Sequence, residues 1–275
     1  MPNFIVGARL HDYGKGTPDE LFRQVSADGF AAVQLAYKKC VPSVKSYADV
    51  TDALVAETVA AEKAHHIQVA VLGTYVELAI NDESRLCNVA DFKSQLAVCK
   101  ALGAGCIGTE TTAMSKQPAG TTRAQAQELL CRSLAEILPA AEALGVTVGI
   151  EPVTYHSMNS AAATRHILDT MRSPNLKVIF DMSNLVSAEN VDAQDRIWYD
   201  MGALLGDQIV AVHFKGQAFA PDGSLLHTSL EESRTDYAGA FAMLRQLPQP
   251  ALPVLREEAV PARAASDIAF MKGFF

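Results

Sequence analysis

Four apolar segments in the C-terminal half of the chain close with ionisable side chains. They are VTVGIE ending in Glu151, LKVIFD ending in Asp181, IVAVHFK carrying His213 and Lys215, and PVLREE carrying Glu257 and Glu258. A single acid at such a position is often only a helix N-cap or half of a salt bridge, and a lone histidine is more often a hydrogen-bonded core residue than a ligand. Brought together in a low-dielectric cavity, three carboxylates and an imidazole would be costly unless a cation neutralised them. The set therefore predicts a divalent metal site.

A metal site of this kind would suit the rearrangement of a small sugar. Oxygen and nitrogen ligands without a thiolate accommodate Mn²⁺, Mg²⁺, Co²⁺ or Zn²⁺, and they leave positions for two adjacent substrate oxygens. The ligand set does not choose among these metals, and we take Mn²⁺ as the first candidate. The ion would polarise a carbonyl and stabilise the enediolate formed when a neighbouring C–H proton is removed. Glu151 and the last-strand glutamate could move that proton from one position to another, as in an isomerase or epimerase.

Two further polar residues follow the candidate ligands along the chain. Asn184, three residues after Asp181, could hydrogen-bond to the metal shell or to a sugar hydroxyl, or it could form an Asx turn. Lys215 lies two positions beyond His213, so on a continuing strand the two side chains point to the same side. It could hold a substrate oxygen or a developing oxyanion, or form a salt bridge with a ligand carboxylate. Both are candidate substrate-binding residues.

Three residues from other parts of the chain are expected at the same cavity. His11 and Glu110 close early apolar segments, and His156 follows Glu151 by five positions. Each is a candidate for contact with the substrate, although Glu110 could equally cap a helix.

The segments that position these residues alternate in character. Short runs rich in β-branched residues recur about every 25 to 45 residues, and Ala- and Leu-rich stretches with helical periodicity separate them. Several of these stretches end in a glycine, as at Gly29, Gly103 and Gly145, which is typical of a helix C-terminus. The predicted strands are 4–8, 31–36, 67–73, 105–110, 146–151, 176–181, 209–215 and 253–258. The clearest helices are 17–29, 51–66 and 122–145.

This alternation predicts a closed (β/α)₈ TIM barrel. Strands separated by helices pair in parallel through right-handed crossovers, and near-continuously apolar strands are covered on both faces. An open doubly wound sheet is the alternative, but no GxGxxG turn follows an early strand and no GxxxxGK[ST] loop exists. We therefore predict one TIM barrel domain over residues 1–275. The carboxyl ends of barrel strands face one cavity, where the residues above would meet.

Several segments resemble the sugar phosphate isomerase/epimerase family, the xylose-isomerase-like TIM barrels. The metal-ligand strands of that family are similar to GIEPV (149–153), FDMSN (180–184), VHFKG (212–216) and PVLREE (253–258). The resemblance covers nearly the whole chain, since it extends to GARLHDYG (7–14), VQLAYKK (33–39), VLGTYVELA (71–79) and REEAVPARAASDIAFMK (256–272).

The resemblance also implies a ligand set. The family ligands Glu, Asp, His and Glu correspond here to Glu151, Asp181, His213 and one of Glu257 and Glu258. The usual strand-eight pattern, counted from Pro253, favours Glu257, and only one of two neighbouring strand residues can point inward. The family commonly has Lys then Asp after the histidine, whereas this chain has Lys215 then Gly216. The loop 229–237 also lacks the Gly-rich turn of many members. Both departures fall on substrate-facing loops, so they bear on the substrate more than on the metal.

Composition narrows the possible partners and location. The chain is 49% hydrophobic and 20% charged, which is typical of a folded globular protein. A net charge of −8, from 23 basic and 31 acidic residues, argues against nucleic acid as a partner. No cationic leader and no apolar run of membrane-spanning length are present, and five cysteines without CxxC spacing indicate reduced thiols, so we expect a cytoplasmic protein without membrane contacts. From the resemblance alone, a homo-oligomer acting in carbohydrate metabolism is expected.

Other functions would use a similar site and stay open at this point. An inosose-type dehydratase would need much the same metal centre. An apurinic-site endonuclease would need further ligands and a basic groove, which the acidic balance disfavours. A non-catalytic sugar-binding barrel would have no need to keep four candidate metal ligands.

Overall fold

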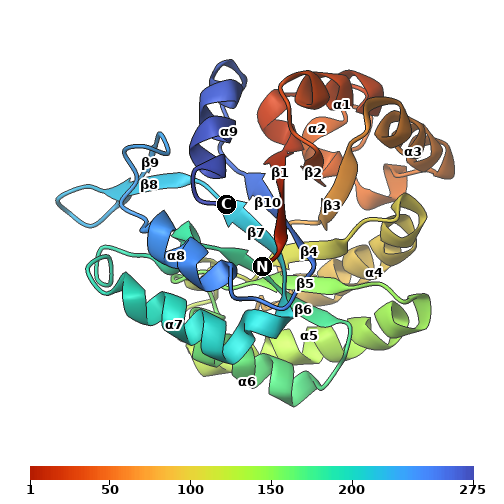
Figure 1. The fold of residues 1–275 in the computed structure, drawn as a ribbon. Helices are drawn as coiled ribbons and strands as arrows, with labels where there is room; N and C mark the ends of the chain where they lie inside the picture. Colours follow the sequence, from red (N-terminus) through yellow and green to blue (C-terminus); the bar gives the residue numbers. More distant parts are fainter.

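The computed structural model describes residues 1–275 and contains a closed barrel of eight strands surrounded by helices (Figure 1). Neighbouring strands are parallel and follow the order β1-β10-β7-β6-β5-β4-β3-β2 around the barrel. The predicted TIM barrel is confirmed. The barrel strands are β1 (Asn3–Arg9), β2 (Ala32–Leu35), β3 (Gln68–Gly73), β4 (Cys106–Glu110), β5 (Val148–Glu151), β6 (Leu176–Asp181), β7 (Ile209–Phe214) and β10 (Ala251–Arg256).

Several helices begin and end at residues typical of helix termini. Gly29, predicted as a helix end, follows Asp28, which is the C-cap of α1. Thr17 and Thr122 form capping boxes at the starts of α1 and α5, and Gly103 and Gly145 end α4 and α5 in the left-handed conformation. None of the helices is both long and apolar enough to cross a membrane. The helices are α1 (Pro18–Ala27), α2 (Tyr37–Cys40), α3 (Asp52–His65), α4 (Ser84–Leu102), α5 (Arg123–Leu144), α6 (Ala161–Met171), α7 (Gln194–Leu205), α8 (Tyr237–Leu244) and α9 (Ala264–Lys272).

Apolar side chains fill the inside of the barrel beneath its carboxyl rim. The side chain of Ile179 occupies the space beside two strand glycines. A Cβ at Gly108 would lie 2.5 Å from its Cδ1, and one at Gly149 would lie 2.9 Å from its Cγ1. The barrel interior is therefore a packed core. The interior cluster consists of Ala32, Ala70, Val71, Cys106, Ile179, Ala211 and Leu255.

One element was not predicted from the sequence. Strands β8 (Gly216–Phe219) and β9 (Leu225–Thr228) pair antiparallel and form a hairpin that projects from the barrel after β7 (Figure 1). The hairpin begins at Gly216, where the sequence departs from the Lys-Asp pattern of the family. The departure therefore falls at the start of the connection between β7 and α8.

Candidate functional site

Three of the predicted metal ligands come from neighbouring strands at the carboxyl rim. Glu151 and Asp181 are the last residues of β5 and β6, and His213 is the residue before the last of β7. The pairing register sets Asp181 beside His213. All three residues are buried, and one ligand atom from each lies within 4.8 Å of the others. They could therefore reach a single ion.

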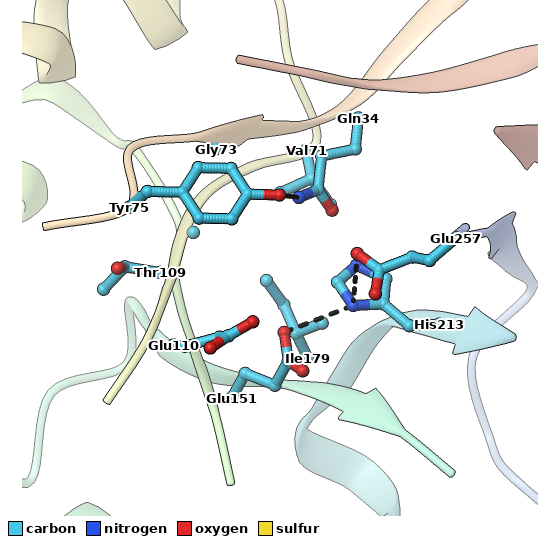
Figure 2. Close-up of a pocket in the computed structure, with 11 residues that line it drawn as sticks. Gln34, Val71, Gly73, Tyr75, Thr109, Glu110, Glu151, Ile179, His213 and Glu257 are labelled. Carbon is cyan, nitrogen blue, oxygen red and sulfur yellow. Dashed lines mark hydrogen bonds and ion pairs between the residues drawn. The ribbon is translucent and has the colours of Figure 1, made fainter. Parts of the chain in front are cut away.

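Glu257 directly follows β10 and approaches the same point from another direction. Its Oε1 atom lies 3.4 Å from Nδ1 of His213, whose Nδ1 also lies 3.2 Å from Oε2 of Glu151 (Figure 2). Glu258 has a left-handed backbone with φ +56° and places its Oε1 atom 2.9 Å from Nη2 of Arg9. Of the two glutamates, Glu257 is the one that faces the other candidate ligands, as the family pattern favoured.

The buried atoms of this group have the properties of metal ligands. Nε2 of His213 is shielded from solvent and has no hydrogen-bond partner. Nδ1 of His213 and Oδ2 of Asp181 are equally shielded and contact charged neighbours, at 3.2 Å from Glu151 and 2.9 Å from Lys215. Buried polar atoms are nearly always paired, so the unpaired Nε2 atom beside these carboxylates calls for a further partner. Carboxylate oxygens and imidazole nitrogens are ligands that divalent metals accept. The donor set therefore fits a divalent cation.

Burial and mutual charge shift the protonation of the same residues. Burial alone would lower the pKa of His213, but the Glu257 and Glu151 carboxylates outweigh it and raise that pKa to about 9. Burial would raise the pKa of Glu257, but His213, Lys215 and Arg9 lower it to about 2. In the metal-free protein, the protonated imidazole of His213 thus neutralises part of the negative charge that a bound metal ion would otherwise neutralise.

Lys215 and Asn184 lie against the candidate ligands. The Nζ atom of Lys215 is 2.9 Å from Oδ2 of Asp181 and 3.6 Å from Oε2 of Glu257, so it forms the salt bridge that was one of its two predicted roles. The backbone N–H of Asn184 donates to Oδ1 of Asp181 at 2.8 Å, and its Nδ2 donates to Oε1 of Glu151 at 2.6 Å. The side chain of Asn184 therefore holds a ligand carboxylate, and the side chain that accepts from the backbone in the turn is that of Asp181.

The other predicted residues lie at different depths of the cavity. Glu110 lines both the inner pocket in Figure 2 and an outer pocket that opens beside it, and burial together with the Glu151 and Glu257 charges raises its pKa to about 7. His156 lines the outer pocket only, with Nε2 3.8 Å from Oε2 of Glu110. His11 packs edge to face on Tyr75, with ring centroids 5.7 Å apart, and lines neither pocket.

Three residues that were not predicted from the sequence lie at or beside the inner pocket. Arg9 pairs with Asp12 at 2.7 Å and lies 3.8 Å from Oε2 of Glu257, and Gln34 and Tyr75 line the inner pocket. Arg9 is the last residue of β1, so the search for ionisable residues at strand ends could have found it. Gln34 lies within β2, where a polar residue in an otherwise apolar strand is the signal. Tyr75 follows β3 in a loop and carries no comparable signal.

Solved structures with a similar fold include two sugar epimerases. The apo form of 3-keto-D-glucoside 4-epimerase from E. coli is 17% identical, with a TM-score of 0.72 over 98% of this chain and 100% of that chain. D-psicose 3-epimerase, solved in the presence of D-fructose, is 16% identical, with a TM-score of 0.71 over 100% and 98%. The IolI protein with a bound zinc atom is 15% identical, with a TM-score of 0.74 over 100% and 96%. At these identities the likeness establishes the fold.

The family of the chain can be identified from its sequence. No curated protein matches the chain significantly. The model of the xylose isomerase-like TIM barrel matches residues 22–273, which includes β2 to β10 and all four candidate ligands. With the closed barrel and the acidic rim described above, this match shows that the chain belongs to the xylose isomerase-like TIM barrel family.

Proposed function

We propose that the protein is a divalent-metal-dependent isomerase or epimerase of a small sugar, sugar phosphate or related keto acid. The observation that carries the proposal is the convergence of Glu151, Asp181, His213 and Glu257 at one buried point of the barrel rim. Two neighbours of the same fold are sugar epimerases by name, and a third holds zinc, which supports the choice of reaction and of a metal.

Glu151, Asp181, His213 and Glu257 would hold the metal. When bound, the ion supplies Lewis acidity that polarises a substrate carbonyl and stabilises negative charge on the adjacent oxygen. Mn²⁺ is the first candidate, and Mg²⁺, Co²⁺ and Zn²⁺ are alternatives because all accept oxygen and nitrogen ligands.

The two glutamates are the proposed proton carriers. Glu151 and Glu257 lie on either side of His213 Nδ1, at 3.2 and 3.4 Å, and each comes from a different, non-adjacent strand of the barrel. One would remove a proton from the carbon next to the carbonyl, and the other would return a proton to the enediolate of the sugar. Asn184 fixes one oxygen of Glu151, which leaves Oε2 to act on the substrate. Lys215 would stabilise the oxyanion, because its ammonium group is buried among the carboxylates.

Proton exchange tests this proposal directly. The protein is loaded with Mn²⁺ and incubated in D₂O with a panel of ketoses, and deuterium at carbons next to the carbonyl is followed by NMR together with any new sugar. We expect incorporation with at least one ketose, and a loss of at least about 100-fold in Glu151→Gln, which keeps the shape but cannot take up the proton.

Glu57→Gln is the matched control, since Glu57 is exposed on α3 away from the rim, and its exchange rate should equal that of the wild type. Metal content is measured on the same samples. Less than half an equivalent of divalent metal, or neither exchange nor product with any ketose, would contradict the proposal and favour a barrel that binds without turnover.

A further inference from the structure

We infer that Gln34 and Tyr75 form a hydroxyl-binding pair that selects a neutral, hydroxyl-bearing end of the substrate. The inference rests on the proposed function and specifies its substrate class. In Figure 2 the two side chains lie together on the wall of the inner pocket that faces Glu110 and Glu151 across the cavity. A sugar held by the carboxylate side would therefore present its other edge to them.

The pair has one donor and one acceptor without partners. Nε2 of Gln34 donates to the Tyr75 hydroxyl oxygen at 2.8 Å, so the Tyr75 O–H hydrogen remains free to donate elsewhere. Gln34 is only 5% exposed, and its Oε1 atom is shielded from solvent and accepts no hydrogen bond. Buried amide oxygens are nearly always paired, so this one, at the wall of the inner pocket, is available to accept from a bound group.

The surrounding structure holds the pair rigidly. Tyr75 has a left-handed backbone with φ +53°, which is uncommon for a residue with a Cβ. Gly73 makes room for both partners, because a Cβ there would lie 3.2 Å from Nε2 of Gln34 and 3.2 Å from Cε2 of Tyr75. The Lys39 ammonium lies 3.5 Å from the Tyr75 ring centroid, and His11 packs on the ring edge. A tyrosine fixed in this way loses little freedom when it binds a ligand.

The donor and acceptor define the chemical class of the ligand. A sugar hydroxyl both accepts and donates, so it can take the Tyr75 hydrogen and give its own to Oε1 of Gln34. A carboxylate or an ionised phosphate only accepts, and it would set its lone pairs against that buried oxygen. We therefore expect the ketose carbon chain to carry a free hydroxyl at this position, with any anionic group confined to the opposite end.

Polyol binding provides a test that does not depend on turnover. Xylitol, sorbitol and galactitol, which lack a carbonyl, are titrated into the Mn²⁺-loaded protein by calorimetry. We expect Tyr75→Phe and Gln34→Met each to weaken the best of them about tenfold, since a site built to bind a hydroxyl is sensitive to loss of either partner. Tyr199→Phe is the matched control because Tyr199 is 68% exposed on α7, and it should change nothing.

Monodeoxy analogues of the best polyol separate recognition from a structural role. One analogue should bind the wild type about tenfold more weakly than its parent and should lose no further affinity in Tyr75→Phe, because the hydroxyl and its partner are then both absent. Equal losses for the parent and every analogue would mean that the pair only shapes the pocket, and would overturn the inference. Absence of polyol binding by the wild type would also overturn it.

The same variants distinguish this inference from the proposed function. If polyols bind with the expected pattern but no ketose exchanges deuterium in the wild type, the reaction is wrong and the hydroxyl site stands. If deuterium exchange in the wild type persists with unchanged KM in Tyr75→Phe and Gln34→Met, the reaction stands and the hydroxyl site is wrong.

Discussion

The ionisable side chains at the rim shift one another's pKa, and His213 shows the consequence most clearly. Its ring lies 3.2 Å from Glu151 and 3.4 Å from Glu257, and it is inaccessible to water. A proton on this imidazole and a metal ion would compete for the same nitrogens, because a histidine ligand must be deprotonated where it binds. The acid–base state of His213 should therefore govern both the stability of the metal-free protein and its affinity for metal.

The pH dependence of the metal-free protein follows from the pKa of His213. Its folded-state pKa of about 9 lies above the unfolded value of 6.5, so its stabilising contribution is complete below pH 6.5 and is lost as the pH rises to about 9. In the presence of EDTA, the free energy of unfolding in urea should fall over this range. Mn²⁺ affinity, measured by calorimetry, should rise over the same range.

His213→Gln supplies the comparison for this experiment. Its unfolding free energy should lack the decline between pH 6.5 and about 9, since the titrating group is gone. Identical pH profiles for the variant and the wild type would show that His213 is not the group responsible.

At the level of elements, the end of β10 is held from two sides, and this places Glu257. On the outside, Nε of Arg256 pairs with Oδ2 of Asp267 on α9 at 2.8 Å, and its Nη1 donates to the Glu257 carbonyl. On the other side, Oδ2 of Asp12, in the turn after β1, accepts from the N–H of Ala259 at 2.9 Å. The buried pair with Asp267 therefore helps to fix the residue before Glu257.

Breaking the buried pair tests this arrangement. Asp267→Ala would leave the Arg256 guanidinium buried without its carboxylate, and we expect a loss of about 3–5 kcal/mol in the free energy of unfolding by urea. Asp192→Ala is the control, because the Asp192 side chain is 93% exposed and its loss should cost less than about 0.5 kcal/mol. A cost below about 1 kcal/mol for Asp267→Ala would contradict this arrangement, because it would mean that water replaces the lost carboxylate.

At the scale of the whole molecule, the barrel holds the site in place because its interior is closely packed. Ile179 fills the space left by Gly108 on β4 and Gly149 on β5, directly below the strand ends that carry Glu110 and Glu151. Because the interior has no empty space beside Ile179, a change in side-chain volume there should displace the neighbouring strands.

A double-mutant cycle measures this packing. Gly108→Ala should cost about 1–3 kcal/mol through overpacking, and Ile179→Ala should cost about 2–5 kcal/mol through the cavity it leaves. The double variant should cost at least about 1 kcal/mol less than the sum, because the new methyl group enters the vacated space. Urea unfolding of the four proteins gives the result, and strict additivity would contradict the contact between the two positions.

Much of this protein can be predicted from the order of its residues. Strand and helix periodicity, with capping residues such as Thr17 and Gly145, determines the eight βα units, and eight such units close into a barrel. Strand ends then meet at one rim, so Glu151, Asp181 and His213 could be selected before any coordinates. These features follow from local chain geometry, which a sequence pattern reports directly.

Only the tertiary structure decided how the site is completed. The direction of Glu257 depends on contacts made by α9 and by the turn after β1, and the contact between Gln34 and Tyr75 joins residues 41 positions apart. The hairpin of β8 and β9 was missed because its strands, GQAF and LLHT, lack the runs of β-branched residues that mark the barrel strands. Cross-strand neighbours arise from barrel closure and register, and the alternation of residues along one strand carries no information about them.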